Sequence, residues 1–483
     1  MTIESAAIIG GGLSGLAAGL HLAREGVQVD VFEARDDVGG CCSTANVGGY
    51  TFNEGAMFLA VPQLLDSVYA RLGLDRAALL PLKRIEVPQA SVLDSGTRVV
   101  LGPDRSLRIE GADEAARTLA ANAELARFLD RWRPVLRVFA DDLLTRPMSL
   151  THVLASAWRY LPQLRGTLAQ ELTRAFDDVD VRAAMSAAAL YTGIAPERTP
   201  IFQIVGIVSM FEDGVHLPER GMGAIADGLA QALRDAGGRI HLGTTVERIE
   251  LQGGRARALR IAGQEERAFD AVVSTVGGMN TFERLLDPGQ VPTAMRRRAR
   301  KAPLSHRALG VQLGLRNRLA PEAFCINHVP AMEQQHRMHR PLPADSAWLS
   351  YTVPSTVLPQ LAPEGGSVVE LYAGVDPDLP MDAWDEDTTR RAADEAIARL
   401  ARHETLDIAQ ARIVTPREHA RRLHLYEGAL YGLSPAATPQ QQFPHRTPID
   451  GLYLAGQTTY PGFGVATSLW SGVFAGDEAL GRG

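Results

Sequence analysis

The chain has 483 residues, 46% of them hydrophobic and 22% charged, and a formal net charge of −7 at neutral pH. A chain of this length exceeds what one hydrophobic core supports and suits two or three domains. Because nucleic-acid binding requires a basic face, this acidic balance argues against a nucleic-acid partner.

The sequence also lacks signals for export or membrane insertion. The first predicted strand begins at residue 6, which leaves no room for a signal peptide, and no apolar run approaches the roughly 20 residues of a membrane-spanning helix. The three cysteines, Cys41, Cys42 and Cys325, are too few for a disulfide framework and suit a reducing compartment. We therefore expect a cytoplasmic protein.

The N-terminal residues predict a nucleotide-binding turn. Residues 6–9 form an apolar run typical of a buried parallel strand. The motif Gly10-x-Gly12-x-x-Gly15 follows at once, and the next residues, 16–24, continue with helical periodicity. In such a turn the first glycine permits the tight bend, the second lets a diphosphate approach the backbone, and the third brings the helix close to the sheet. We expect the phosphates at the helix N-terminus.

A second strand completes this unit. Residues 27–32 predict the strand, and Glu33 stands at its end, where a carboxylate can accept hydrogen bonds from both hydroxyls of a ribose. An acid at this position disfavours a 2′-phosphate. The unit combines a strand, the glycines, a helix, a second strand and an acid in the expected order. Nucleotide binding therefore explains the motif better than a glycine-rich turn that binds no ligand.

The nucleotide-binding pattern returns twice later in the chain. Residues 221–236 begin with two glycines and predict a helix, and residues 239–242 predict a short parallel strand. Residues 269–276 predict another buried strand. A last strand at residues 449–455 leads into a glycine-rich segment and a helix that begins near Val465. The nucleotide-binding domain is therefore expected to be discontinuous.

Two insertions separate these returns, at residues 85–215 and 285–410. The first is expected to be mostly helical from residue 114 to residue 211. The second holds candidate sheet strands, at residues 308–315, 348–353 and 367–374. The fold class that we expect is α/β, a Rossmann-like nucleotide-binding domain joined to a mixed-sheet domain with a helical cap.

Four passages make the chain resemble a known family. The N-terminal motif with the double glycine Gly39-Gly40, and the segment Gly-Tyr-Thr-Phe-Asn-Glu-Gly at residues 49–55, resemble the amine-oxidase-like flavoprotein superfamily. Residues 191–200 and 428–472 point more narrowly to its phytoene-desaturase-like branch, the FAD-dependent carotenoid desaturases, isomerases and their relatives. The resemblance implies a GR2-type flavoprotein fold.

FAD is the cofactor that this resemblance implies. The FAD-binding domain is expected at residues 1–84, 216–284 and 411–483, and the substrate domain with its helical cap at residues 85–215 and 285–410. The residues that the resemblance places at FAD are Gly10, Gly12, Leu13, Ser14, Gly15, Glu33, Ala34, Arg35, Gly39, Gly40, Glu54, Gly55, Ala56, Met57, Val246, Ser274, Thr275, Gly456, Gln457, Gly464, Val465 and Ala466.

Two positions depart from the family's pattern. Cys41 stands where an arginine commonly follows the double glycine, so a charged contact to the cofactor has to come from elsewhere, with Arg35 as the candidate. Gln457 stands where the family commonly has an acid, and its amide can still hydrogen-bond ribityl hydroxyls. FAD binding is compatible with both departures.

The chemistry implied by this cofactor makes few demands on acids and bases. FAD accepts a hydride from an activated C–H bond, while the protein positions that carbon and excludes water. Tyr460 and Phe463 are catalytic candidates as a cavity wall beside the flavin, with ordinary packing as the alternative. Glu54 is a candidate acid or base, with a structural contact as the alternative.

No metal site is expected. His328, His336 and His339 are loosely grouped, and a solvated loop explains them better than a set of metal ligands. The sequence also contains no Ser-His-Asp or Cys-x-x-Cys pattern in a suitable local context.

A contact with lipid stays open. Residues 130–170 mix aromatic and aliphatic side chains with arginines, among them Trp132, Trp158 and Arg159. A helix that enters lipid headgroups and admits a lipophilic substrate has this composition. An equal alternative to lipid contact is that these helices cover the active site and extend their arginine side chains to solvent. A peripheral contact with the inner membrane therefore remains an alternative to a purely cytoplasmic protein.

The resemblance implies hydride transfer between a lipophilic polyene or isoprenoid-like substrate and flavin N5, in a desaturation, isomerisation or cyclisation. Three alternatives stay open: a natural-product polyene cyclase of the polycyclic tetramate macrolactam type, a flavin amine oxidase, and a non-catalytic escort-like binding protein. The intact glycines and Glu33 argue against the last of these. The oligomeric state is not predicted.

Overall fold

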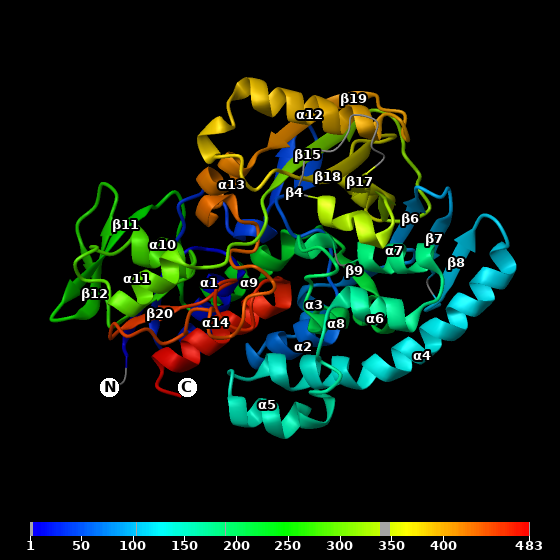
Figure 1. The fold of residues 1–483 in the computed structure, drawn as a ribbon. Coiled ribbons are helices and arrows are strands. Elements are labelled where there is room, and N and C mark those ends of the chain that lie inside the picture. Colours follow the sequence, from blue (N-terminus) through cyan, green and yellow to red (C-terminus); the bar gives the residue numbers. More distant parts are fainter. Residues whose placement is uncertain (1–2, 103, 189, 339–347, 483) are drawn as a thin grey trace.

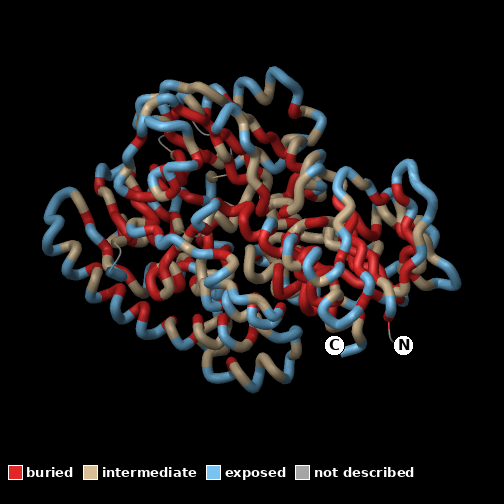
Figure 2. Tube along the Cα trace, turned by 180° about the vertical axis from the view of Figure 1, so that it is seen from behind, coloured by how far each residue is buried: buried red, intermediate tan, exposed pale blue. Residues whose placement is uncertain are grey.

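Two sheets and a set of capping helices organise the molecule (Figure 1). The structure is a computed structural model that describes residues 3–102, 104–188, 190–338 and 348–482. Figure 2 shows that buried residues run through both sheets, while exposed residues gather on the outer helices and loops.

The first sheet has five parallel strands in the order β10-β2-β1-β14-β20. Apolar side chains fill both of its faces, as is usual for parallel sheets covered on both sides. The strands come from three separate parts of the chain, as the returning pattern predicts. Their bounds are β1 Ser5–Ile9, β2 Gln28–Phe32, β10 Arg239–His241, β14 Ala271–Ser274 and β20 Leu452–Leu454.

Three helices cover one face of this sheet: α1 (Leu13–Arg24), α9 (Ala224–Asp235) and α14 (Val465–Ala479). Helix α1 begins three residues earlier than the periodicity predicts, because Gly12 is its N-cap and the glycine motif forms its first turn. Helices α1 and α14 pack closely. A Cβ on Gly472 would lie 2.2 Å from the carbonyl oxygen of Ser14, so only glycine fits there.

A three-stranded antiparallel sheet and two helices cover the opposite face. Apolar residues of β1 and β2 pack there against this small sheet. The bounds are β11 Val246–Gln252, β12 Arg255–Ile261, β13 Arg267–Ala268, α10 Gly278–Glu283 and α11 Thr293–Arg300.

The second large sheet has eight strands in the order β19-β15-β18-β17-β16-β6-β7-β8. It is mixed, because β16 and β6 are parallel and the other neighbours are antiparallel. Strands β15, β17 and β18 confirm the three strands predicted in the second insertion. The bounds are β6 Gln89–Leu93, β7 Arg98–Leu101, β8 Leu107–Glu110, β15 Ala308–Leu315, β16 Cys325–Val329, β17 Leu349–Thr352, β18 Ser367–Gly374 and β19 Ile408–Val414.

The two faces of this sheet differ. One face is apolar and packs against α12 (Glu386–Leu400), which lies across the sheet in Figure 1. Val311, Leu371 and Leu400 belong to this packed layer. The other face is directed toward the five-stranded sheet and the helical cap.

The helical cap has a buried part and an exposed part. In α4, Trp132 is fully buried and its indole N–H donates a hydrogen bond to Glu171 at 3.0 Å. This part of residues 130–170 is therefore core rather than a lipid-facing surface, whereas α5 and its flanking turns expose the large apolar side chains Met148, Leu150, Leu154 and Trp158. The bounds are α4 Glu114–Asp141, α5 Leu150–Ala157, α6 Leu168–Ala175, α7 Val179–Ala187 and α8 Ile204–Glu212.

Shorter elements connect the sheets and the cap. None of the helices in the described ranges combines the length and apolar character needed to cross a membrane. The remaining bounds are β3 Thr44–Val47, β4 Tyr50–Asn53, α2 Pro62–Arg71, α3 Arg76–Leu79, β5 Leu82–Ile85, β9 Val215–Pro218 and α13 Pro416–Arg422.

Candidate active site

A cavity of about 840 Å³ lies where the two large sheets and the cap meet. The glycine-rich turn after β1 lines one part of it, and the cap side chains Phe139, Leu144 and Phe202 line another. One space therefore contacts both the nucleotide-binding motif and the apolar underside of the cap.

Glycine is required at several points of the turn between β1 and α1. Gly10 has a φ of +103°, which side chains with a Cβ rarely adopt. A Cβ on Gly15 would lie 2.0 Å from the carbonyl oxygen of Gly10. Gly12 has open space where its Cβ would be, and it caps a helix whose first N–H groups point toward the cavity end of the turn. This cradle fits a dinucleotide diphosphate.

Glu33 is buried at the end of β2 and lines the same cavity. Its Oε2 accepts a hydrogen bond from the backbone N–H of Gly11 at 2.7 Å, and its Oε1 accepts one from the N–H of Arg35 at 2.9 Å. Because a carboxylate offers about four acceptor sites, lone pairs remain for ribose hydroxyls. The two backbone bonds fix the orientation of the carboxylate.

A second glycine-led helix meets the cavity at its N-terminus. Gly464 is the N-cap of α14 and has a φ of +114°. Val465 and Ala466, in its first turn, line the cavity. Because the first N–H groups of a helix lack intrahelical partners and carry partial positive charge, this end favours negative charge on a ligand.

Most of the residues expected at the cofactor meet in this cavity. Two do not line it: Gly15 lies against Gly10 behind the turn, and the buried hydroxyl of Ser274 hydrogen-bonds to Thr281 at 2.7 Å. The expected residues that line the cavity are Gly10, Gly12, Leu13, Ser14, Glu33, Ala34, Arg35, Gly39, Gly40, Glu54, Gly55, Ala56, Met57, Val246, Thr275, Gly456, Gln457, Gly464, Val465 and Ala466.

The two aromatic candidates have different positions. Phe463 lines the cavity and stacks on Tyr431 with ring centroids 4.4 Å apart. Tyr460 is not among the lining residues: its hydroxyl donates a hydrogen bond to the carbonyl oxygen of Leu143, and its ring lies parallel to Phe474. The expectation that Tyr460 forms a cavity wall is corrected here, because its side chain is turned into the contact between α14 and the cap.

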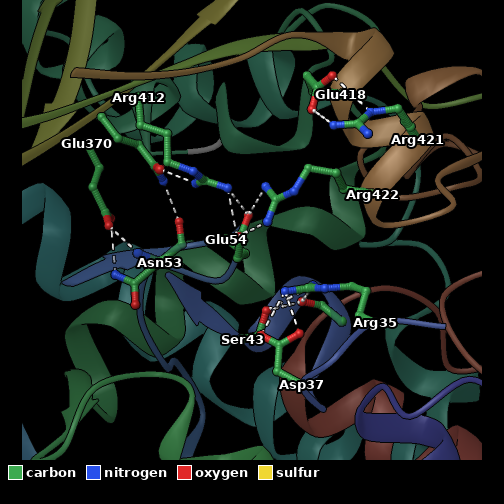
Figure 3. Close-up of polar contacts among 12 residues, drawn as sticks. Arg35, Asp37, Ser43, Asn53, Glu54, Glu370, Arg412, Glu418, Arg421 and Arg422 are labelled. Carbon is green, nitrogen blue, oxygen red and sulfur yellow. Dashed lines mark hydrogen bonds and ion pairs between the residues drawn. The ribbon is translucent and has the colours of Figure 1, made fainter. Parts of the chain in front are cut away.

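Glu54 is held by two arginines (Figure 3). Arg412 contacts its carboxylate at 2.8 and 2.9 Å, and Arg422 contacts it at 2.8 and 3.2 Å. Burial would raise the pKa of Glu54, but the hydrogen bonds from Arg422 and Arg412 outweigh it and lower the pKa below its ordinary value. Such an ion-paired carboxylate is a weak base, so the geometry favours a structural role over the acid or base role considered from the sequence.

Arg35 is committed to contacts within the protein. It donates to Ser43 Oγ at 3.1 Å and to Asp37 at 2.8 Å, as Figure 3 shows, and it also lines the cavity.

Burial raises the pKa of the Cys41 thiol to about 11, so this thiol is uncharged at neutral pH. Arg422, which belongs to no motif recognised in the sequence, also brings a positive charge to the cavity lining.

The histidine group expected in a solvated loop is placed differently. His328 is a buried residue of β16 and stacks on His403 with ring centroids 3.6 Å apart, so that expectation is wrong for His328. His336 is exposed, and His339 lies outside the described residues. Within the part of the chain that the structure describes, no three His, Cys, Asp or Glu side chains gather as metal ligands would.

Other lining residues were not singled out from the sequence. They come from loops and short helices without a nucleotide-binding pattern, although the pair Gly277-Gly278 after β14 marks a turn of the kind that approaches a ligand. Examples are Thr244, Asn280, Arg284, His419 and Tyr426. Tyr431 also lines the cavity and lies within residues 428–472, which carry the family resemblance.

Comparison with known proteins agrees with this geometry. The profile of the family described as flavin containing amine oxidoreductase matches residues 13–480. The chain is 28% identical to a zeta-carotene-forming phytoene desaturase of Myxococcus xanthus, over 96% of this chain and 91% of that protein. It is 28% identical to a phytoene dehydrogenase of Streptomyces griseus, over 99% and 96%. A 4,4'-diapophytoene desaturase of Staphylococcus aureus is 25% identical, over 98% of both chains.

Solved structures share the fold. An oxidoreductase from Methanosarcina mazei superposes with a TM-score of 0.65 at 16% identity, covering 98% of this chain and 100% of that one. A redesigned putrescine oxidase superposes with a TM-score of 0.63 at 16% identity, covering 99% and 98%. At this identity the likeness concerns the fold alone.

The chain belongs to the flavin-containing amine oxidoreductase family. It is an FAD-dependent oxidoreductase, and its resemblance to the phytoene-desaturase-like branch is confirmed. The glycine cradle, the buried acid and the two helix N-termini fit FAD.

The first prediction concerns Glu33. We expect Glu33→Ala to weaken FAD binding about tenfold or more, because hydrogen bonds to a charged group contribute about 1.5–3 kcal/mol each. Titration of apoprotein with FAD, followed by flavin fluorescence, measures the Kd. The matched control is Glu25→Ala, which removes an exposed carboxylate paired with Arg482 after the end of α1 and should leave the Kd unchanged. A wild-type Kd for Glu33→Ala would refute the role of Glu33.

The second prediction concerns the pair of arginines on Glu54. We expect Arg412→Met to lower the free energy of unfolding by about 2–3 kcal/mol, because a buried carboxylate loses one of its two cationic partners. Arg421→Met is the matched control. Arg421 pairs with Glu418 at the surface, where such pairs contribute little, so its loss should change stability by about 0.5 kcal/mol or less. Urea denaturation compares the two variants, and equal midpoints would contradict the prediction.

Proposed function

We propose that this flavoenzyme removes a hydride and a proton from a long lipophilic polyene. The observation that carries this proposal is the continuity of the cavity, in which the flavin-binding turn and the apolar underside of the cap line one space. Phe58, Phe139, Leu144, Phe202 and Val205 supply large apolar lining on the cap side. The desaturases named above, which match nearly the whole chain, support the same substrate class.

The chain's own residues would act mainly by position. FAD, when bound, supplies the hydride acceptor. Phe463 and Tyr431 stack beside the glycine-led start of α14, where a flat conjugated substrate can pack against them. The N–H groups of Val465 and Ala466 favour negative charge at this end of the cavity. The apolar cap wall excludes water.

Two acid–base groups of the cavity lining, Tyr431 and Glu54, are already engaged. The Tyr431 hydroxyl donates to the carbonyl oxygen of Tyr191, and burial raises the pKa of Tyr431, so it stays protonated. Glu54 is ion-paired with two arginines. Hydride removal from an allylic carbon suits such a site, because the developing positive charge is delocalised along the polyene. The cation left after hydride removal is a strong acid, so its proton can pass to a weak acceptor such as solvent water at the cavity mouth, which completes the desaturation.

Anaerobic reduction of the flavin tests this function. We expect phytoene, delivered in lipid vesicles to the oxidised holoenzyme, to bleach the visible flavin absorption in a single turnover. Squalane, a saturated hydrocarbon of similar bulk, is the control and should leave the flavin oxidised, because it has no activated C–H bond. Product mass separates the reactions: loss of two hydrogens marks desaturation, and unchanged mass marks isomerisation or cyclisation. Bleaching by putrescine but not by phytoene would replace the proposal with amine oxidation.

The proposal includes a peripheral contact of α5 with a membrane. Leu150, Leu154 and Trp158 follow one another at helical spacing and are 67%, 51% and 65% exposed. Arg159 and Arg165 are exposed beside them, which suits anionic lipid headgroups. Helix α5 projects at the lower edge of the molecule in Figures 1 and 2. It follows the turn that holds the cavity-lining residue Leu144, so a lipophilic substrate could enter there from the bilayer.

Co-sedimentation with vesicles that contain anionic lipid tests this contact. We expect the triple variant Leu150→Ser, Leu154→Ser, Trp158→Ser to bind at least tenfold more weakly, because burying each side chain contributes about 1.5–3 kcal/mol. Leu119→Ser is the control, since Leu119 is 76% exposed but lies on α4 away from this face. Wild-type binding by the triple variant would exclude α5 as the contact.

A further inference from the structure

The eight-stranded sheet turns a polar face toward the cavity. Side chains alternate between the two faces of a strand, and the face against α12 is apolar. On the opposite face, residues that lie directly across from one another on neighbouring strands form a continuous polar row. The row consists of Arg412, Gln312, Glu370, Thr352, Cys325 and Gln89.

This polar row is buried rather than solvated. Gln312, Glu370, Thr352 and Gln89 are each 1% exposed. A buried polar group without a hydrogen-bond partner costs about 1–3 kcal/mol, so each member of the row needs one. A member of the row that has no hydrogen-bond partner in the protein therefore indicates where a ligand binds.

The part of the row on β15, β18 and β19 is satisfied within the protein. Arg412 donates to the side-chain oxygen of Gln312, and Gln312 donates to the carbonyl oxygen of Asn53. Glu370 accepts from the backbone N–H of Asn53 at 2.6 Å and from its side-chain amide at 3.1 Å. Figure 3 shows the contact between Glu370 and Asn53 beside Glu54 and its two arginines. This part of the row serves to join the sheet to the end of β4.

The part on β16 and β17 is not satisfied. Ser350 Oγ donates to Asn327 Oδ1 at 2.6 Å, and the Tyr191 hydroxyl hydrogen-bonds to Cys325 Sγ at 2.6 Å. Thr352 Oγ1, Asn327 Nδ2 and Gln89 Oε1 are buried and have no hydrogen-bond partner among the described residues. Of these three residues, Thr352 lines the cavity, as do Ser350 and Tyr191, whereas Asn327 and Gln89 are not part of the lining. We call these five residues, Tyr191, Cys325, Asn327, Ser350 and Thr352, the polar subsite.

We infer that the polar subsite binds an oxygen atom of the substrate, a carbonyl or hydroxyl oxygen attached to the polyene. This inference rests on the proposed function and narrows its substrate class. The unpaired Thr352 hydroxyl belongs to a lining residue and has a hydrogen to donate, which matches an acceptor oxygen. A pure hydrocarbon at this wall would leave this donor unpaired. The cap wall is apolar and the sheet wall is polar, so the cavity suits a polyene with oxygen on one side.

Matched probes of equal size test the inference. Retinol is a polyene with a hydroxyl group, and axerophthene is the same molecule with hydrogen in place of that hydroxyl. Their Kd values for the oxidised holoenzyme, measured by quenching of protein fluorescence in detergent micelles, should differ about tenfold in favour of retinol. Binding is measured without turnover, so the result does not depend on which reaction the enzyme catalyses.

Two variants assign the preference to the polar subsite. Thr352→Val should reduce the preference for retinol toward one without weakening the binding of axerophthene. Thr352→Val should also leave the thermal midpoint unchanged or raise it, because a buried unpaired hydroxyl becomes a methyl group. If the Thr352 hydroxyl were merely structural, its removal would lower the thermal midpoint. Thr51→Val is the control: Thr51 is a β4 residue outside the cavity lining, and its variant should keep the full preference.

The outcomes separate this inference from the proposed function. Equal binding of retinol and axerophthene by the wild type, or a preference that survives Thr352→Val, would overturn the polar subsite while polyene binding stands. Failure of both probes to bind would overturn the polyene substrate and the subsite together. A preference for retinol that Thr352→Val abolishes and Thr51→Val retains would support the inference.

Discussion

The structure depends on how the eight-stranded sheet is joined to the nucleotide-binding half. The segment Asn53-Glu54 supplies this junction: Asn53 bonds to Glu370 and Gln312, and Glu54 is held by Arg412 and Arg422. Moving a pair of ionised side chains from water into the protein interior adds little net stability. A single unpaired charge left there, however, would lower the stability of the fold by several kcal/mol. The network ties this segment to strands β15, β18 and β19 and to helix α13. Glu54, Glu370 and Arg422 of the network also line the cavity.

Local sequence was enough to predict the nucleotide-binding half. The alternation of apolar runs with glycine turns located β1, α1, β2, α9, β14 and α14, and the spacing of Glu33 after Gly15 placed an acid beside the turn. Each of these features is encoded by neighbours in the chain, where steric demands on glycine and the periodicity of apolar residues are visible. The helix start at Leu13 was missed by three residues because the glycines themselves form the first turn.

The substrate side could not be predicted in the same way, because its contacts join residues far apart in the chain. Strands β6, β7 and β8 come from the first insertion, yet they extend the sheet made by the second. Glu54 meets Arg412 and Arg422 only after the sheet forms, so the sequence left its role open. Tyr460 stands in the motif expected at the flavin, but its side chain turns toward the cap. Sequence periodicity specifies which residues share a strand face, whereas the register between strands decides what lies beside them.

The order of strands in the five-stranded sheet bears on how the protein folds during synthesis. Strand β1 emerges early and lies at the centre of the sheet, but β14 and β20, which extend the sheet on one side, are made much later. Helix α14 then packs on α1, so the first helix to be synthesised contacts the last one. Contacts so distant in sequence are slow to form and leave apolar strand edges exposed meanwhile. A ribosome-bound chain that has not reached residues 452–479 therefore has to be protected from aggregation, and it cannot yet assemble the complete flavin pocket.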